Sequence, residues 1–278
     1  MTEKTISASP APEPEKLARR KFLGLASVAL FAPMIAGCTL RSKTFRYRLT
    51  LSLNTPDGVK TGSVVNEVTH SEVYGFPNGR VYPSYHRGQA LFVDLGPGRK
   101  PLIALMVYSC SQQQKCPDLS YNEVMQLANW ANFGPTGIFT NHPAFKVDDD
   151  YGFIKGVSKW KAMRAHVNLK LQELPDLITF KDINDPLTVE RVDPWHLEDN
   201  LGAGVSLNAM TVDVVDDSTP VVFDLETKLP WYAKMRDIQK QKHFDIGLDG
   251  DDNGWGESSG KWTLANSIRL YNFEHGRD

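Results

Sequence analysis

The chain has 278 residues, of which 41% are hydrophobic and 23% are charged, as is ordinary for a globular protein. This composition excludes a disordered chain, a coiled coil, a collagen and a polytopic membrane protein. The net charge of -2 argues against a dedicated nucleic-acid binder, because such proteins need a basic field.

Residues 1–37 are predicted to be a signal peptide, which is set aside before the fold is considered. A polar, proline-rich opening leads to a pair of arginines, and an uninterrupted apolar stretch follows from Phe22 to Met34. This stretch is too short to cross a bilayer core, which takes roughly 20 apolar residues.

Two motifs in this segment resemble known export signals. The first resembles the twin-arginine motif, with Ala18 and Gly24 in place of its usual serine and lysine; the matching residues are Arg19, Arg20, Phe22 and Leu23. The second resembles a lipobox and consists of Ile35, Ala36, Gly37 and Cys38. An ordinary signal peptide with an accidental cysteine and an uncleaved membrane anchor are the alternatives.

The two resemblances imply a lipoprotein of the cell envelope that faces the periplasm and is exported by the twin-arginine route. Cys38 would be lipidated and would attach the protein to a membrane, since a multi-chain anchor binds firmly. Residues 38–45 would be the lipidated cysteine and a short tether. Residues 1–38 contain five basic and three acidic residues, which leaves 26 basic and 30 acidic residues beyond them. A mildly acidic body will not adhere to anionic lipid by itself.

Residues 46–278 are predicted to form one soluble domain. Alternating side chains from Arg46 to Leu53 predict a half-buried strand, Asn54 to Gly58 a turn, and Thr61 to Val68 a return strand. Residues 70–89, rich in Tyr, Pro, Gly and Arg, are typical of a long loop.

Two further strands are expected at Ala90 to Leu95 and Leu102 to Val107, the second apolar throughout and therefore central. A capping-box pattern at Ser120 and Glu123 predicts a helix from about 120 to 132. Residues 133–158 are expected to be loop. Residues 159–174 fit a helix or a strand.

In the last third of the chain, strands are expected at Leu177 to Phe180 and Asn208 to Val215. A helix is expected from about Pro220, broken or kinked at Pro230. Neighbouring strands with few helices between them predict an α+β fold with a mainly antiparallel sheet and a few packed helices.

Several short stretches of this domain resemble an uncharacterised family of exported proteins from alphaproteobacteria. They are 46–50, 55–59, 61–63, 87–90, 93–96, 182–186, 192–194, 201–205, 211–214 and 228–231. The segments around the Cys110–Cys116 pair and after Lys240 depart from the pattern. No activity of the family can be carried over to this chain.

The other two cysteines, Cys110 and Cys116, are predicted to form a disulfide. They are close in sequence, and the export compartment is oxidising. Two cysteines cannot complete a structural zinc site. A free thiol is the alternative.

An acidic segment near the C-terminus matches the first half of a calcium-binding loop. Asp249, Asp251 and Asn253 alternate and Gly254 permits the turn, while Glu257 could add an oxygen ligand. The twelfth position, where such loops have a bidentate acid, is Gly260. The segment is therefore either a weak calcium site, with calcium as the cofactor, or a solvated acidic turn.

One segment combines aromatic and basic residues of the kinds that dominate interface hot spots. They are Tyr74, Phe76, Arg80, Tyr82, Tyr85, His86 and Arg87. This segment is either a recognition surface or a loop packed on its own domain. No catalytic motif is recognised, and the seven histidines do not have metal-ligand spacing.

Two functions follow from these observations. The first is a lipid-anchored binding or structural module whose partner is an envelope protein or a glycan. The alternative is an exported hydrolase or metal-assisted enzyme with a dispersed active site. A concave pocket with converging acids and histidines would favour the enzyme. A flat sheet with an aromatic patch would favour the binding module.

Overall fold

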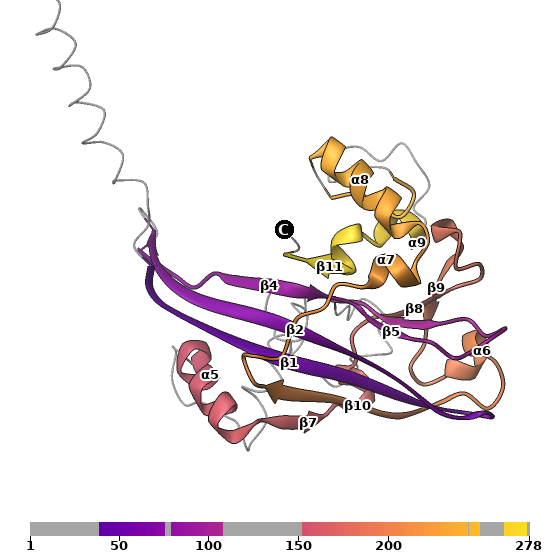
Figure 1. Ribbon diagram of the computed structural model, residues 1–278, viewed down its shortest axis with the longest axis horizontal. Coiled ribbons are helices and arrows are strands. Elements are labelled where there is room, and N and C mark those ends of the chain that lie inside the picture. Colours follow the sequence, from indigo (N-terminus) through magenta and orange to yellow (C-terminus); the bar gives the residue numbers. More distant parts are fainter. Residues whose placement is uncertain (1–38, 76–78, 108–151, 244, 251–263, 277–278) are drawn as a thin grey trace, which may run out of the picture.

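The computed structural model describes residues 39–75, 79–107, 152–243, 245–250 and 264–276. Two antiparallel sheets and a layer of short helices make up this part of the chain (Figure 1). The predicted α+β class with a mainly antiparallel sheet is confirmed.

The larger sheet has the strand order β11-β4-β2-β1-β10-β7, with β3 added beside β2. We call it the main sheet. Its strands are β1 (Thr39–Thr55), β2 (Gly58–Gly75), β3 (Gly79–Val81), β4 (Ser84–Gln89), β7 (His166–Asn168), β10 (Ser206–Val215) and β11 (Glu274–His275).

The long hairpin of β1 and β2 runs the length of the main sheet (Figure 1). Pro56 and Asp57 form its turn, and Gly58 has the positive φ of 104° that follows from so tight a reversal. The predicted strands and turn are confirmed here. The predicted tether is wrong, because residues 39–45 are the first part of β1.

The predicted long loop over residues 70–89 is also wrong. The end of β2 and the strands β3 and β4 occupy most of it, and β2 pairs with both. These strands have many exposed side chains, so they lack the alternation of apolar and polar residues that would have indicated them.

The smaller sheet has the order β5-β6-β8-β9. Its strands are β5 (Leu91–Val93), β6 (Leu102–Ala104), β8 (Leu177–Phe180) and β9 (Val189–Val192). The expected strands at 90–95, 102–107 and 177–180 are confirmed, although the first two are shorter than predicted.

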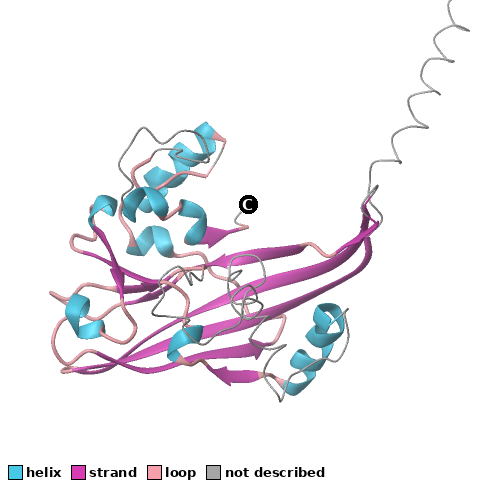
Figure 2. Cartoon of the chain, turned by 180° about the vertical axis from the view of Figure 1, so that it is seen from behind, coloured by secondary structure: helices cyan, strands magenta, loops and turns pink. Residues whose placement is uncertain are grey.

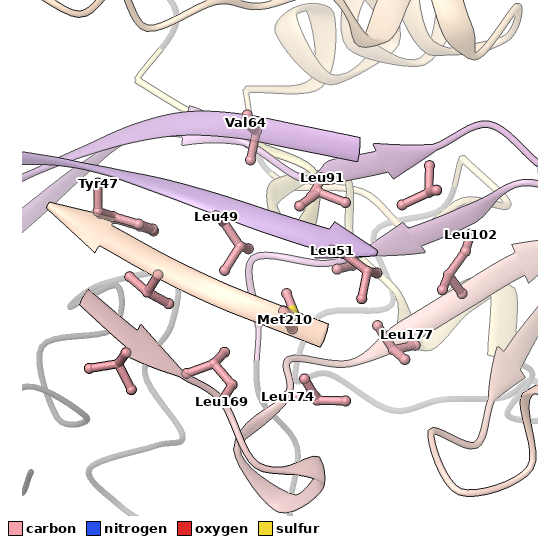
Figure 3. Close-up of a cluster of buried hydrophobic side chains, with 14 of the residues drawn as sticks. Tyr47, Leu49, Leu51, Val64, Leu91, Leu102, Leu169, Leu174, Leu177 and Met210 are labelled. Carbon is pink, nitrogen blue, oxygen red and sulfur yellow. The ribbon is translucent and has the colours of Figure 1, made fainter. Parts of the chain in front are cut away.

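The smaller sheet lies between two hydrophobic clusters, which explains why β6 is apolar throughout. Leu102 and Leu177 pack with the inward residues of the main sheet, such as Leu51 (Figure 3). Ile103 and Ile178 point the other way and pack with the helical layer. The prediction that β6 is buried on both faces is therefore confirmed.

The helical layer covers the outer face of the smaller sheet (Figure 2). It contains α7 (Leu225–Lys228), α8 (Tyr232–Lys242), α9 (Leu264–Ser267) and the 3-10 turn η4 (Leu270–Asn272). The helix expected from Pro220 begins instead at Leu225, and Pro230 separates α7 from α8. Shorter elements elsewhere are α6 (Leu197–Leu201), η2 (Leu171–Glu173) and η3 (Pro186–Thr188).

Helix α5 (Gly152–Met163) packs against the inner face of the main sheet. Its Trp160 is fully buried and meets the Phe45 ring edge-on, with 5.7 Å between the centroids. The expected loop over 133–158 is therefore wrong from Gly152 onward. The expected helix at 120–132 lies outside the described residues.

Candidate functional site

Most of the predicted site residues lie outside the described part of the chain. This applies to the signal motif, Cys38, Cys110, Cys116, Asp251, Asn253 and Glu257. Their assignments stay predictions.

Asp249 is the one predicted calcium ligand in the part of the chain that the structure describes. It is exposed, and it precedes Gly250, whose φ of 82° fits a sharp turn. The carbonyl of Gly250 accepts a hydrogen bond of 2.7 Å from Nζ of Lys242. That carbonyl therefore already has a cationic donor.

A cleft of about 320 Å³ lies on the outer face of the main sheet. Its floor is formed by β1 and β2, and its wall is the segment 216–224, which crosses these strands between β10 and α7 (Figure 1). We call this segment the strap. The lining residues are Arg48, Ser63, Val64, Val65, Gln89, Thr219, Pro220, Val222 and Asp224.

Arg48 supplies the cleft with a cationic group that has no partner among the described residues. Arg48 lies opposite Asp213 of β10, but the carboxylate of Asp213 contacts His166 and Thr211. An exposed guanidinium presents five N–H donors in a planar arrangement that fits a carboxylate or a phosphate.

Arg46, two residues before Arg48, fixes the strap instead. Its Nε is 2.7 Å from a carboxylate oxygen of Glu67, and its Nη1 donates to the carbonyls of Asp217 and Thr219. Arg46 thus holds the wall of the cleft in place, whereas Arg48, the next outward-facing residue of β1, lines the cleft.

Asp224 and Gln89 form the far side of the cleft. The Gln89 amide donates to Asp224 and accepts from the backbone N–H of Asp224 at 2.8 Å. Burial acts to raise the pKa of Asp224, but hydrogen bonds from Lys228 and Gln89 outweigh it and lower the pKa below its ordinary value. Asp224 is therefore an ionised, already paired carboxylate.

Three histidines are buried elsewhere, and none of them lines the cleft. They are His70, His86 and His275. Burial lowers the pKa of His70 to about 4, and burial together with the charge of His86 lowers that of His275 to about 3. Both rings are therefore neutral near pH 7 and serve as packing and hydrogen-bonding groups in the folded protein.

Comparison with models of protein families finds no match to the chain. Comparisons with curated proteins and with solved structures find none either.

The predicted aromatic segment forms the free end of the main sheet. Tyr74, Tyr82 and Tyr85 are exposed, whereas His86 is buried, and Phe76 lies outside the described residues. We call residues 40–43, 71–74 and 80–85 of β1 to β4 the strand tip. The sequence indicated its tyrosines, but it did not indicate that Leu40 belongs with them.

A buried carboxylate contacts both arginines of the strand tip. The Glu72 side chain is 3% exposed and lies 2.8 Å from Nη1 of Arg80 and 3.7 Å from Nε of Arg41. The two guanidinium groups are themselves largely exposed. The buried Glu72 carboxylate therefore positions two exposed cations, Arg41 and Arg80, at the surface of the tip.

No helix in the described part of the chain has both the length and the apolar character needed to cross a membrane.

Proposed function

We propose that the chain is a lipid-anchored binding module of the cell envelope, facing the periplasm, whose cleft takes a ligand carrying a carboxylate. The anchor rests on the lipobox that ends at Cys38 and on the twin-arginine motif at Arg19 and Arg20. The binding role rests on one observation, which is that the guanidinium of Arg48 lines the cleft and has no partner in the part of the chain that the structure describes.

The chemistry of the cleft favours binding. A carboxylate can accept two parallel N–H bonds from one guanidinium, and such charge-assisted pairs are roughly twice as strong as neutral hydrogen bonds. Ser63 adds a hydroxyl, and Pro220 and Val222 add apolar surface for the rest of the ligand. The ligand would belong to an envelope protein or a glycan.

The alternative function, an exported hydrolase or metal-assisted enzyme, needs a base or metal ligands that converge on a substrate. In the described ranges, no three His, Cys, Asp or Glu side chains form a group that could hold a metal ion. The acid in the cleft, Asp224, is paired with Lys228 at 2.8 Å. The binding interpretation therefore accounts for more of the cleft's geometry.

The anchor is tested by fractionation of cells that produce the full chain. Cys38→Ala should abolish acylation, and Arg19→Lys with Arg20→Lys should keep the protein in the cytoplasm. Acylation is read from the intact mass of the membrane-extracted protein. Normal membrane fractionation of both variants would contradict the anchor and the export route.

The cleft is tested with succinate as the carboxylate probe, titrated into the detergent-solubilised mature protein. Binding is followed as a rise in the melting temperature, since a ligand that binds the native state stabilises it. Arg48→Gln should lose this rise. Arg191→Gln, an arginine on β9 of the smaller sheet, is the matched control and should keep it. An equal response from wild type and Arg48→Gln would overturn the cleft assignment.

A further inference from the structure

We propose that the strand tip sits in the headgroup region of the membrane beside the acyl anchor and holds the cleft away from the lipid surface. This inference rests on the proposed lipidation of Cys38. Cys38 is bonded directly to Thr39, the first residue of β1, so an acyl group there would be attached at the strand tip.

Hydrophobic side chains are concentrated on the strand tip. Five of the eleven exposed large hydrophobic residues in the described part of the chain lie there, namely Leu40, Tyr74, Val81, Tyr82 and Tyr85. Three of the five are tyrosines, which are enriched at membrane interfaces because one end of the side chain is apolar and the other is polar.

These side chains lie on both faces of the ribbon of strands. Val81 pairs with Val73, and Tyr85 pairs with Thr69. Val73 and Thr69 are four residues apart on β2, so Val81 and Tyr85 lie on one face, and Tyr74 lies on the other. The headgroup layer surrounds a ribbon that enters it end-on, and it meets both faces.

The charge of the strand tip fits an anionic membrane surface. The tip contains three basic residues, Arg41, Lys43 and Arg80, and one acidic residue, Glu72. The Glu72 carboxylate is buried beneath the two guanidinium groups, so the exposed charge is positive. Basic residues close to an anionic leaflet are attracted to its surface. The remainder of the mature chain is net acidic, so its overall charge does not add to this attraction.

The length of the ribbon of strands also fits insertion of its end into the headgroup layer. Leu40 is five residues from Phe45, the first fully buried core residue of β1, which at a strand rise of about 3.3 Å is about 17 Å. This exceeds the depth of one headgroup layer, about 5–8 Å. The end of the tip, with Leu40, Tyr74 and Tyr82, can therefore enter that layer while the core stays in water. Arg48 lies about 30 Å from Thr39 by the same rise, within reach of periplasmic ligands.

The proposal is tested by photo-cross-linking of the full chain in its native membrane. Tyr74 or Tyr82, at the end of the strand tip, is replaced by p-benzoylphenylalanine, which inserts into nearby C–H bonds on irradiation. Val59 and Leu187, both 59% exposed and outside the tip, receive the same replacement as matched controls. We expect lipid adducts at 74 and 82 in several-fold excess over 59 and 187, detected by mass spectrometry.

The outcomes separate this inference from the proposed anchor. An acylated, membrane-bound protein with no excess of lipid adducts at 74 and 82 would overturn the placement of the tip and leave the anchor intact. Protein adducts in place of lipid adducts would overturn it in favour of a protein partner. A protein whose mass lacks the acyl chains would overturn the anchor itself, on which the inference depends.

Discussion

The hydroxyl of Tyr47 lies 3.2 Å from Nε2 of His86, beneath the main sheet. Asn66 also donates to this hydroxyl, at 3.5 Å, so one phenol connects β1, β2 and β4. The His86 ring in turn stacks on His275 of β11, with 5.6 Å between the centroids. Burial raises the pKa of Tyr47 far above its ordinary value, so the phenol stays protonated. This network is a structural tie between four strands.

We predict that the buried histidines make the protein less stable in acid. In the unfolded chain a histidine titrates near pH 6.5, whereas in the native state the pKa is about 4 for His70 and about 3 for His275. The unfolded state therefore binds more protons below pH 6.5. The free energy of unfolding is highest above that pH and falls by at most about 1.4 kcal/mol per pH unit per histidine until the folded pKa is reached.

Urea unfolding of wild type and His70→Gln between pH 7 and pH 4 checks this prediction. Glutamine does not titrate but can still hydrogen-bond to Ser84, whose hydroxyl lies 2.6 Å from Nδ1 of His70. The variant should lose stability less steeply than wild type below pH 6.5. Parallel curves would show that His70 does not contribute to the acid sensitivity.

We predict that Gly62→Ala destabilises the contact between the two sheets. Gly62 lies on β2 where β5 crosses it, and an added Cβ would lie 2.3 Å from the carbonyl oxygen of Phe92. Because that contact is with backbone, the sheets themselves must shift. Overpacking of this kind costs about 1–3 kcal/mol. The exposed neighbour Ser63→Ala is the control, and equal urea midpoints for the two variants would contradict the prediction.

Side chains that repeat with a regular period made the central strands predictable. Tyr47, Leu49 and Leu51 alternate with polar residues, so the sequence alone indicates which face of β1 is buried. The unbroken apolar run at 102–106 likewise indicates a strand between two layers, and both hydrophobic clusters include residues from it.

Elements that depend on distant partners could not be predicted in this way. Pro220 is a good first residue for a helix, yet α7 begins at Leu225. The reason is Gln89, which accepts the N–H groups of Asp224 and Leu225 from a position 135 residues earlier in the chain. The first part of helix α5, residues 152–158, was missed because Gly152 and Gly156 weaken helix propensity, and the packing of Trp160 against Phe45 compensates.

The candidate cleft depends on the same long-range contacts. The sequence places Arg48 on the outward face of a strand, where a solvent-exposed arginine is unremarkable. The strap that turns this face into a cleft is held by Arg46 and Gln89, and neither contact follows from local sequence.

We predict that Gln89→Leu destabilises the strap and removes the response of the cleft to succinate. The Gln89 side chain is buried and makes three hydrogen bonds to residues 224 and 225. Leucine has a similar size but would leave those groups buried without a partner, which costs about 1–3 kcal/mol. The control is Gln241→Leu, an exposed glutamine on α8. Unchanged stability in Gln89→Leu would mean that the strap is held by Arg46 alone.

We predict that Cys110 and Cys116 form a disulfide in the exported protein and remain thiols in protein retained in the cytoplasm. In the chain-entropy model, closing a loop this short raises the free energy of the unfolded chain, and so stabilises the folded state, by about 2 kcal/mol. Alkylation before reduction, followed by intact mass, should leave both cysteines of the exported protein unmodified. The same treatment of the Arg19→Lys, Arg20→Lys variant should modify both, because the cytoplasm is reducing. Modification of both cysteines in the exported protein would establish free thiols and contradict the predicted bond.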